Sequence, residues 1–193
     1  MAHDPVSRQG WSRRSFLGLG AAAAASALLP RGVAASTLDA ARQPDRVLSF
    51  FNIHTSERLT TAYCCGGTYQ PEALQRINVL LRDFRANEVK PIDTGLLDLL
   101  HRLHGTLGVD EPFHVISGYR SPLTNMMLRA RGGVDSGVAA GSLHMVGKAI
   151  DIRVPGVALE QLRASARSLE LGGVGFYPGS NFVHVDTGRV RFW

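Results

Sequence analysis

The chain has 193 residues, of which 45% are hydrophobic and 19% charged, and this is typical of one soluble globular domain with a sizeable core. Its only cysteines are the adjacent Cys64 and Cys65, which excludes a disulfide framework. A redox switch and a soft metal site are the functional alternatives for this pair. Two neighbouring thiols without spaced partners make a poor zinc site, so we interpret both as structural.

The first 35 residues have the pattern of an export signal. Ser12-Arg13-Arg14-Ser15-Phe16-Leu17 is a twin-arginine stretch, an apolar run follows at 16–29, and Val33-Ala34-Ala35 suits signal-peptidase cleavage. A membrane span would need about 20 apolar residues, more than this run contains. We therefore expect residues 1–35 to direct twin-arginine export to the periplasm and residues 36–193 to form a single domain without a membrane span.

The charge balance changes when this segment is set apart. Four arginines and one aspartate in residues 1–35 contribute +3 of the formal net charge of +5, which leaves +2 for the domain. The domain also lacks a basic run with interleaved aromatic residues. A nucleic-acid partner is therefore not expected.

Strand and helix patterns alternate from residue 47 onward. Short strands are predicted at 47–53 and 59–63, followed by a helix from Pro71 to about Asn87 and a second helix capped at Asp93-Thr94. A strand at 113–116 then leads into a loop and a helix. Because methionines commonly fill core gaps, we interpret Met126 and Met127 of that helix as core residues.

The remaining segments follow a glycine-rich stretch at 131–141, which predicts a flexible loop. A strand at 148–154 and a helix from about 159 come next. Three short strands at the end of the chain are joined by tight turns, and we expect them to pair antiparallel. The predicted architecture is α+β, with helices packed on one face of a small antiparallel sheet.

Polar residues interrupt two of the predicted strands. Strand alternation places Asp151 on one face of its strand and the apolar Ile150 and Ile152 on the other face. In the strand near the C-terminus it places His184 and Asp186 on the same face. If these strands are neighbours, Asp151 and His184 meet, and His144 at the start of the first strand lies close enough to join them. Two imidazoles and one carboxylate are a ligand set that catalytic zinc uses, with a fourth position left to water.

A plainer interpretation of these residues is a buried polar pair. A histidine in a strand is more often a hydrogen-bonded core residue than a ligand, and one His-x6-Asp pair is a weak motif on its own. The metal interpretation gains support from several polar residues that converge after one glycine-rich connection. Zinc would lower the pKa of a bound water from about 15.7 to about 7.

Two motifs resemble a known superfamily. Ser142-Leu143-His144-Met145-Val146-Gly147-Lys148-Ala149-Ile150-Asp151 resembles the S-x-H-x-x-G-x-A-x-D motif of the zinc D-Ala-D-Ala carboxypeptidase and dipeptidase superfamily, which includes murein endopeptidases and the hedgehog amino-terminal domain. Ser117-Gly118-Tyr119-Arg120-Ser121 is similar to the SGYRS segment of the same superfamily. The order and spacing of the motifs after residue 47 resemble the exported murein endopeptidase K group.

The resemblance implies a role for each motif residue. His144, Asp151 and His184 would bind one Zn²⁺ per chain. Arg120 would stabilise the oxyanion formed on the peptide carbonyl, because a fixed cation suits the place where negative charge develops. Ser142 and Tyr119 would contact substrate. The plainer roles are a salt bridge for Arg120 and a cap or loop end for Ser142.

The general base is where the sequence departs from the family pattern. The dipeptidase branch has a carboxylate three residues before the last zinc histidine, and other branches have a histidine two residues before it. This chain has Asn181 and Phe182 at those positions. Asp186, on the same strand face as His184, is the candidate that remains, either as a catalytic base or as a residue that orients His184.

The leading functional hypothesis is a periplasmic zinc endopeptidase that hydrolyses peptide cross-links of peptidoglycan, similar to enzymes acting on bonds to meso-diaminopimelate. Two alternatives stay open. A catalytically silent peptidoglycan-binding module would explain the missing acid at Asn181, and a D-Ala-D-Ala carboxypeptidase would differ only in the bond that is cut.

Overall fold

The structure, a computed structural model, describes Met1 and residues 43–132 and 138–193. The predicted export signal and part of the predicted flexible loop lie outside these residues. The strands are β1 (Arg46–Asn52), β2 (Arg58–Cys65), β3 (Thr68–Tyr69), β4 (Phe113–Ser117), β5 (Ala149–Arg153), β6 (Gly173–Tyr177), β7 (Phe182–Asp186) and β8 (Arg191–Phe192). The helices are α2 (Pro71–Leu80), α3 (Thr94–Leu107), α4 (Pro122–Gly132) and α5 (Leu159–Ser168), with short 3-10 helices η2 (Leu143–Val146) and η3 (Pro178–Ser180).

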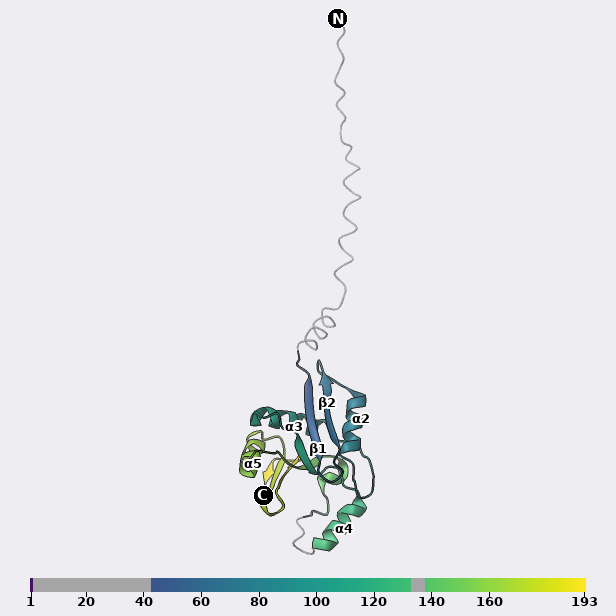
Figure 1. Ribbon diagram of the computed structural model, residues 1–193, viewed down its shortest axis with the longest axis vertical. Helices are drawn as coiled ribbons and strands as arrows, with labels where there is room; N and C mark the ends of the chain where they lie inside the picture. Colours follow the sequence, from purple (N-terminus) through teal and green to yellow (C-terminus); the bar gives the residue numbers. More distant parts are fainter. Residues whose placement is uncertain (2–42, 133–137) are drawn as a thin grey trace. The chain divides into compact units, whose positions relative to one another are not determined.

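The strands form one sheet in the order β3-β2-β1-β4-β5-β7-β6-β8, and Figure 1 shows β1 and β2 side by side. The predicted α+β class is confirmed, but the sheet is mixed, because β1 pairs with β4 and β6 pairs with β8 in parallel. The expectation that the last three strands all pair antiparallel is therefore wrong for β8. One edge of β7 already pairs with β5, so the final strand takes the free edge of β6, and a strand antiparallel to β7 there runs parallel to β6.

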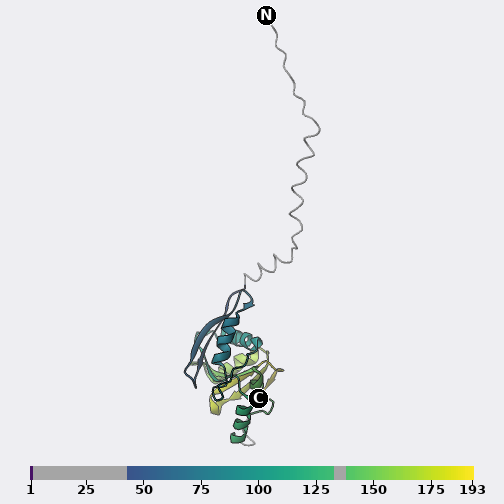
Figure 2. The same cartoon turned by 90° about the vertical axis from the view of Figure 1, so that its right-hand side faces the viewer.

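Three helices cover one face of this sheet, as predicted. α2 packs on β2, α3 on β1, and α5 on β6 and β7, and Figure 2 shows them gathered beside the strands. In β5 and β7 the side chains that face the helices are aliphatic and fully buried: Ile150, Ile152, Val183 and Val185. Because neighbours in a strand point to opposite faces, Asp151, His184 and Asp186 lie on the face without these helices.

α2 ends earlier than the sequence pattern predicts. It ends at Leu80, and the carboxylate of Asp83 then accepts a hydrogen bond from the Arg85 backbone N–H at 3.0 Å and closes a tight turn. The Leu81 carbonyl accepts from the Tyr119 N–H at 2.8 Å instead of continuing the helix. A contact with a distant loop thus overrides helical spacing at this end.

α4 also departs from prediction. Met126 is 60% exposed and Met127 40% exposed, so these methionines are surface residues and not core. Thr124 and Asn125 are the buried side chains on this helix, and Figure 1 shows α4 at the end of the domain away from α3 and α5. Within the described part of the chain, no helix has the length and apolar character needed to cross a membrane.

A cluster of polar side chains lies between α3 and the strands β1, β2 and β3. Asp98 pairs with Arg46 and accepts hydrogen bonds from the Tyr63 and Tyr69 hydroxyls at 2.8 and 2.7 Å. Arg46 also donates to the sulfur of Cys64, which is a buried free thiol. The cysteine therefore packs within a structural cluster, in agreement with the interpretation from sequence.

Candidate metal centre

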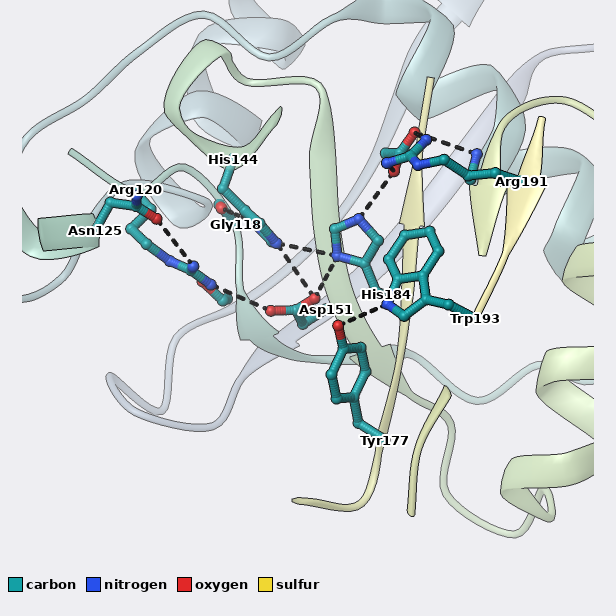
Figure 3. A network of polar contacts seen from close by, with 12 residues as sticks. Gly118, Arg120, Asn125, His144, Asp151, Tyr177, His184, Arg191 and Trp193 are labelled. Carbon is teal, nitrogen blue, oxygen red and sulfur yellow. Dashed lines mark hydrogen bonds and ion pairs between the residues drawn. The ribbon is translucent and has the colours of Figure 1, made fainter. Parts of the chain in front are cut away.

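The three predicted ligands meet at one point (Figure 3). β5 and β7 pair antiparallel with Asp151 directly opposite His184, and η2 brings His144 to the same place. His184 Nδ1 lies 2.8 Å from Asp151 Oδ1, His144 Nε2 lies 3.3 Å from the same oxygen, and the two nitrogens are 3.2 Å apart. All three side chains are buried or nearly so.

Local backbone geometry explains how His144 reaches the site. η2 begins after Ser142 and ends at Gly147, which has a left-handed conformation with φ of 68°. A Cβ at Gly147 would lie 2.4 Å from the Pro91 carbonyl oxygen, so any larger residue would push η2 away. The glycine of the motif is thus required for the placement of His144.

Hydrogen bonds on the far side of each imidazole fix its tautomer. His144 Nδ1–H donates to the Gly118 carbonyl at 2.7 Å, and His184 Nε2–H donates to Asp186 Oδ2 at 3.0 Å. In the neutral form of each ring the opposite nitrogen, which faces Asp151, therefore carries a lone pair. Such outer partners are the usual means of orienting metal-binding histidines.

The three converging atoms fit a tetrahedral metal ion. Zinc bonds of about 2.0–2.1 Å keep ligand atoms about 3.3 Å apart, close to the separations in this cluster. With both tautomers fixed, two lone pairs and a carboxylate oxygen face one another, and only a cation or a shared proton can satisfy them. The donor set therefore fits zinc.

The electrostatics of the cluster favour a positive charge between these atoms. Burial would raise the pKa of Asp151, but His144 and His184 outweigh it and hold that pKa well below its usual range. Burial would lower the pKa of His184, but its bonds to Asp151 and Asp186 raise that pKa to about 8. The cluster therefore attracts positive charge to the space between these three side chains.

Arg120 lies beside this cluster. Its guanidinium is 3.5 Å from Asp151 Oδ2 and 3.4 Å from both Asn125 Oδ1 and Ser117 Oγ. The residue is buried, and its Nε has no hydrogen-bond partner among the described residues. A buried cation thus lies beside the place where the three predicted ligands meet.

A cavity of about 490 Å³ opens onto the cluster. Ser142 lines it, as expected for a substrate contact, and so do Arg120 and the three ligands. Tyr119 does not line it: the ring is 3% exposed and its hydroxyl donates to Glu88 at 2.6 Å. The expectation that Tyr119 contacts substrate is therefore wrong, because its side chain packs into the core while the adjacent Arg120 faces the cavity.

Comparison with known proteins agrees with this geometry. The family model described as "Peptidoglycan L,D-endopeptidase MepK" matches residues 39–193. The chain belongs to this family. A relative in Escherichia coli K12 named peptidoglycan L,D-endopeptidase MepK is 46% identical over 182 residues, covering 94% of this chain and 97% of the relative. A probable peptidoglycan L,D-endopeptidase MepK of Haemophilus influenzae is 41% identical over 183 residues, covering 94% and 95%.

In this MepK-family chain, Asp186 accepts a hydrogen bond from Nε2 of His184, the ring nitrogen that faces away from Asp151. Arg191 pairs with its carboxylate at 2.6 Å, and the Gly188 and Gly173 N–H groups donate to it at 2.8 and 3.2 Å. The residue is fully buried and does not line the cavity. Because both oxygens are occupied, this geometry favours the orienting role over that of a base.

The sequence reasoning missed an aromatic wall of the cavity. Trp193 and Tyr177 line it, joined by a 2.8 Å hydrogen bond from the indole N–H to the hydroxyl, and the indole lies 5.4 Å from the His184 ring. A Cβ at Gly175 would clash with Trp193 at 2.6 Å. Strand alternation, which places Arg191 and Trp193 on one side, was the available signal.

Proposed function

We propose that the protein is a zinc-dependent endopeptidase that hydrolyses peptide cross-links of peptidoglycan, with one zinc ion held by His144, Asp151 and His184. The observation that carries the proposal is the convergence of two imidazole nitrogens and one carboxylate oxygen, with the far nitrogen of each imidazole hydrogen-bonded away from the site. The names of the relatives supply the substrate class. Zinc bound there would act as a Lewis acid and lower the pKa of a coordinated water to about 7.

The protein's own residues would then position and stabilise the reacting groups. Arg120 would stabilise negative charge on the peptide carbonyl oxygen, because its guanidinium is buried beside the ligands and has a free donor. Asp186 would keep Nδ1 of His184 directed at the metal. Ser142 at the cavity wall would hydrogen-bond the substrate peptide.

The same proposal includes export to the periplasm by the twin-arginine route, motivated by Arg13-Arg14 and the apolar run that follows. Replacement of both arginines by lysine keeps the charge but removes the recognised pair. In cell fractionation we expect wild-type protein in the periplasm and the double lysine variant in the cytoplasm. Equal periplasmic amounts of the two proteins would contradict the route.

The activity itself is tested with purified protein, isolated sacculi and zinc, with mass spectrometry of the released muropeptides. We expect cross-linked dimers to become monomers with wild-type protein and to persist with His184→Ala. Release of free D-alanine alone would indicate a carboxypeptidase. Binding to sacculi without any product would instead identify a silent binding module, the alternative raised by Asn181 in place of an acid.

A further inference from the structure

Three arginines line the cavity, and they differ in their partners. Arg120 is paired with Asp151, and Arg191 with Asp186. No carboxylate of the described residues lies within ion-pair distance of Arg85. Asp151 is the only carboxylate among the described residues that line the cavity, and it belongs to the metal centre. The cavity therefore has an excess of positive charge. Arg85 is the lining arginine without an ion-pair partner among the described residues.

The position of Arg85 is fixed by the turn after α2. One oxygen of Asp83 accepts from the Arg85 N–H at 3.0 Å, and the other accepts from the Ser121 N–H at 2.9 Å. Asp83 is itself 1% exposed. A single buried carboxylate thus ties the turn that carries Arg85 to the loop that carries Arg120, so the two guanidinium groups face the same cavity.

Stacking on an aromatic ring further restricts the Arg85 side chain. Its guanidinium carbon lies 4.2 Å from the centre of the Phe84 ring, and this ring stacks on His54 at 4.2 Å. His54 in turn contacts the Ile116 carbonyl through Nε2 at 3.1 Å and lines the cavity. Stacking of this kind leaves the in-plane N–H donors of a guanidinium available to a ligand.

We propose that Arg85 binds a free carboxylate of the substrate peptide and so makes the enzyme prefer anionic cross-links. The inference rests on the proposed function and names the part of the substrate that this cavity selects. A peptide that contains diaminopimelate has two sources of such a group, the second carboxylate of that residue and the C-terminal carboxylate. A planar guanidinium matches either of them through two parallel hydrogen bonds.

The test compares three synthetic cross-linked muropeptides: one with both carboxylates free, one with the diaminopimelate carboxylate converted to an amide, and one with the C-terminal carboxylate converted. For zinc-loaded wild-type protein we expect kcat/KM to fall roughly tenfold for one of the two amides, the size of one charge-assisted contact. Arg85→Gln should cleave that amide and the free acid equally well. Arg85→Lys should retain part of the preference.

Arg58→Gln is the matched control, because Arg58 stacks on Phe51 at 4.1 Å and does not line the cavity. It should keep the wild-type preference, while zinc content and melting temperature stay unchanged in both glutamine variants. A wild-type protein that cleaves all three peptides alike, or an Arg85→Gln protein that keeps the full preference, would overturn the inference.

Calorimetric binding of the cleaved peptides, as free acids and as amides, separates this inference from the proposed function. If the wild-type protein hydrolyses nothing, the proposed endopeptidase activity fails. Tighter binding of the acid by wild-type protein and equal binding by Arg85→Gln would still support the role of Arg85. Equal binding of acid and amide by wild-type protein would refute it.

Discussion

Two polar clusters on different parts of the sheet, one partly buried and one buried, show how the partners of a carboxylate indicate its role. At the first, Asp98 is surrounded by donors: the Arg46 guanidinium and the hydroxyls of Tyr63 and Tyr69. Every oxygen of Asp98 has a proton directed at it. The cluster is complete without any further ion, as expected for a group whose role is to join β1, β2 and α3.

The second cluster has one such donor, the Arg120 guanidinium, which lies 3.5 Å from Asp151 Oδ2. His144, Asp151 and His184 point toward one another (Figure 3). In the neutral form of each imidazole the nitrogen facing Asp151 carries a lone pair, because the far nitrogen donates to Gly118 or to Asp186. Such an excess of acceptors is costly unless a proton or a metal cation lies between them. The two clusters therefore differ in hydrogen-bond partners as well as in burial, since the Asp98 side chain is 26% exposed and that of Asp151 7%. Both differences support the proposal that the second cluster binds a metal.

The largest expected effect comes from removing the metal-centre carboxylate. Asp151→Ala should lose its zinc and at least about 10³-fold in kcat/KM, because the Lewis acid contributes several kcal/mol. Added zinc should raise the melting temperature of wild-type protein, since a ligand that binds only the folded state stabilises it. Zinc should not shift the melting temperature of Asp151→Ala. A variant with full zinc content would contradict the ligand assignment.

Asp186→Asn separates an orienting role from a base. If Asp186 orients His184, zinc affinity should fall about 10–100-fold, while kcat at saturating zinc stays near the wild-type value. Competition with a fluorescent chelator measures the affinity. Arg191→Gln, which leaves Asp186 in place but removes its ion pair, should change affinity in the same direction by less. Unchanged affinity with a collapsed kcat would restore the catalytic-base interpretation.

Asp98→Asn tests the cluster that is complete without a metal. Loss of its charged pair with Arg46 and weaker bonds to the two tyrosines should lower the free energy of unfolding by about 2 kcal/mol. Urea titration measures the change. Zinc content and kcat/KM should match the wild-type protein, and a loss of zinc would show that the clusters are coupled. Tyr69→Phe, which removes one hydroxyl, should cost about 1 kcal/mol.

The convergence of the three proposed ligands could be predicted from the sequence because strand alternation has a fixed period. With period two, Asp151, His184 and Asp186 can be assigned to faces before any pairing is known. The helix boundary after Leu80 is different, because Leu81 and Phe84 continue a helical spacing. A hydrogen bond from the Tyr119 N–H to the Leu81 carbonyl, 38 positions along the chain, decides the outcome there.

The exposure of the α4 side chains and the order of the strands also depend on contacts between segments far apart in the sequence. The methionines of α4 have the spacing of a buried face, yet Met126 is 60% exposed and Met127 40% exposed. β8 pairs with β6 because β5 already occupies the other edge of β7. The aromatic wall at Trp193 depends on that strand order, which is why the sequence alone did not reveal it.

The smallest expected effect concerns Asp83, a buried carboxylate whose two oxygens both accept hydrogen bonds. Burial would raise its pKa, but bonds from Thr124, Ser121 and Arg85 outweigh burial and lower the pKa below the ordinary 3.8. A depressed pKa in the folded state gives stability that is complete above about pH 4 and is lost as the pH falls through the folded-state value.

Urea titrations of zinc-free protein between pH 2.5 and pH 6 should therefore show wild-type stability decreasing on the acid side. In Asp83→Asn, which cannot titrate, that decrease should be shallower, and at pH 6 the variant should be less stable than wild type. If the free energy of unfolding falls equally with decreasing pH in both proteins, the charge of Asp83 does not stabilise the contact between the turn that carries Arg85 and the loop that carries Arg120. Because zinc is absent, the metal-centre carboxylates titrate equally in both proteins and cancel in the difference.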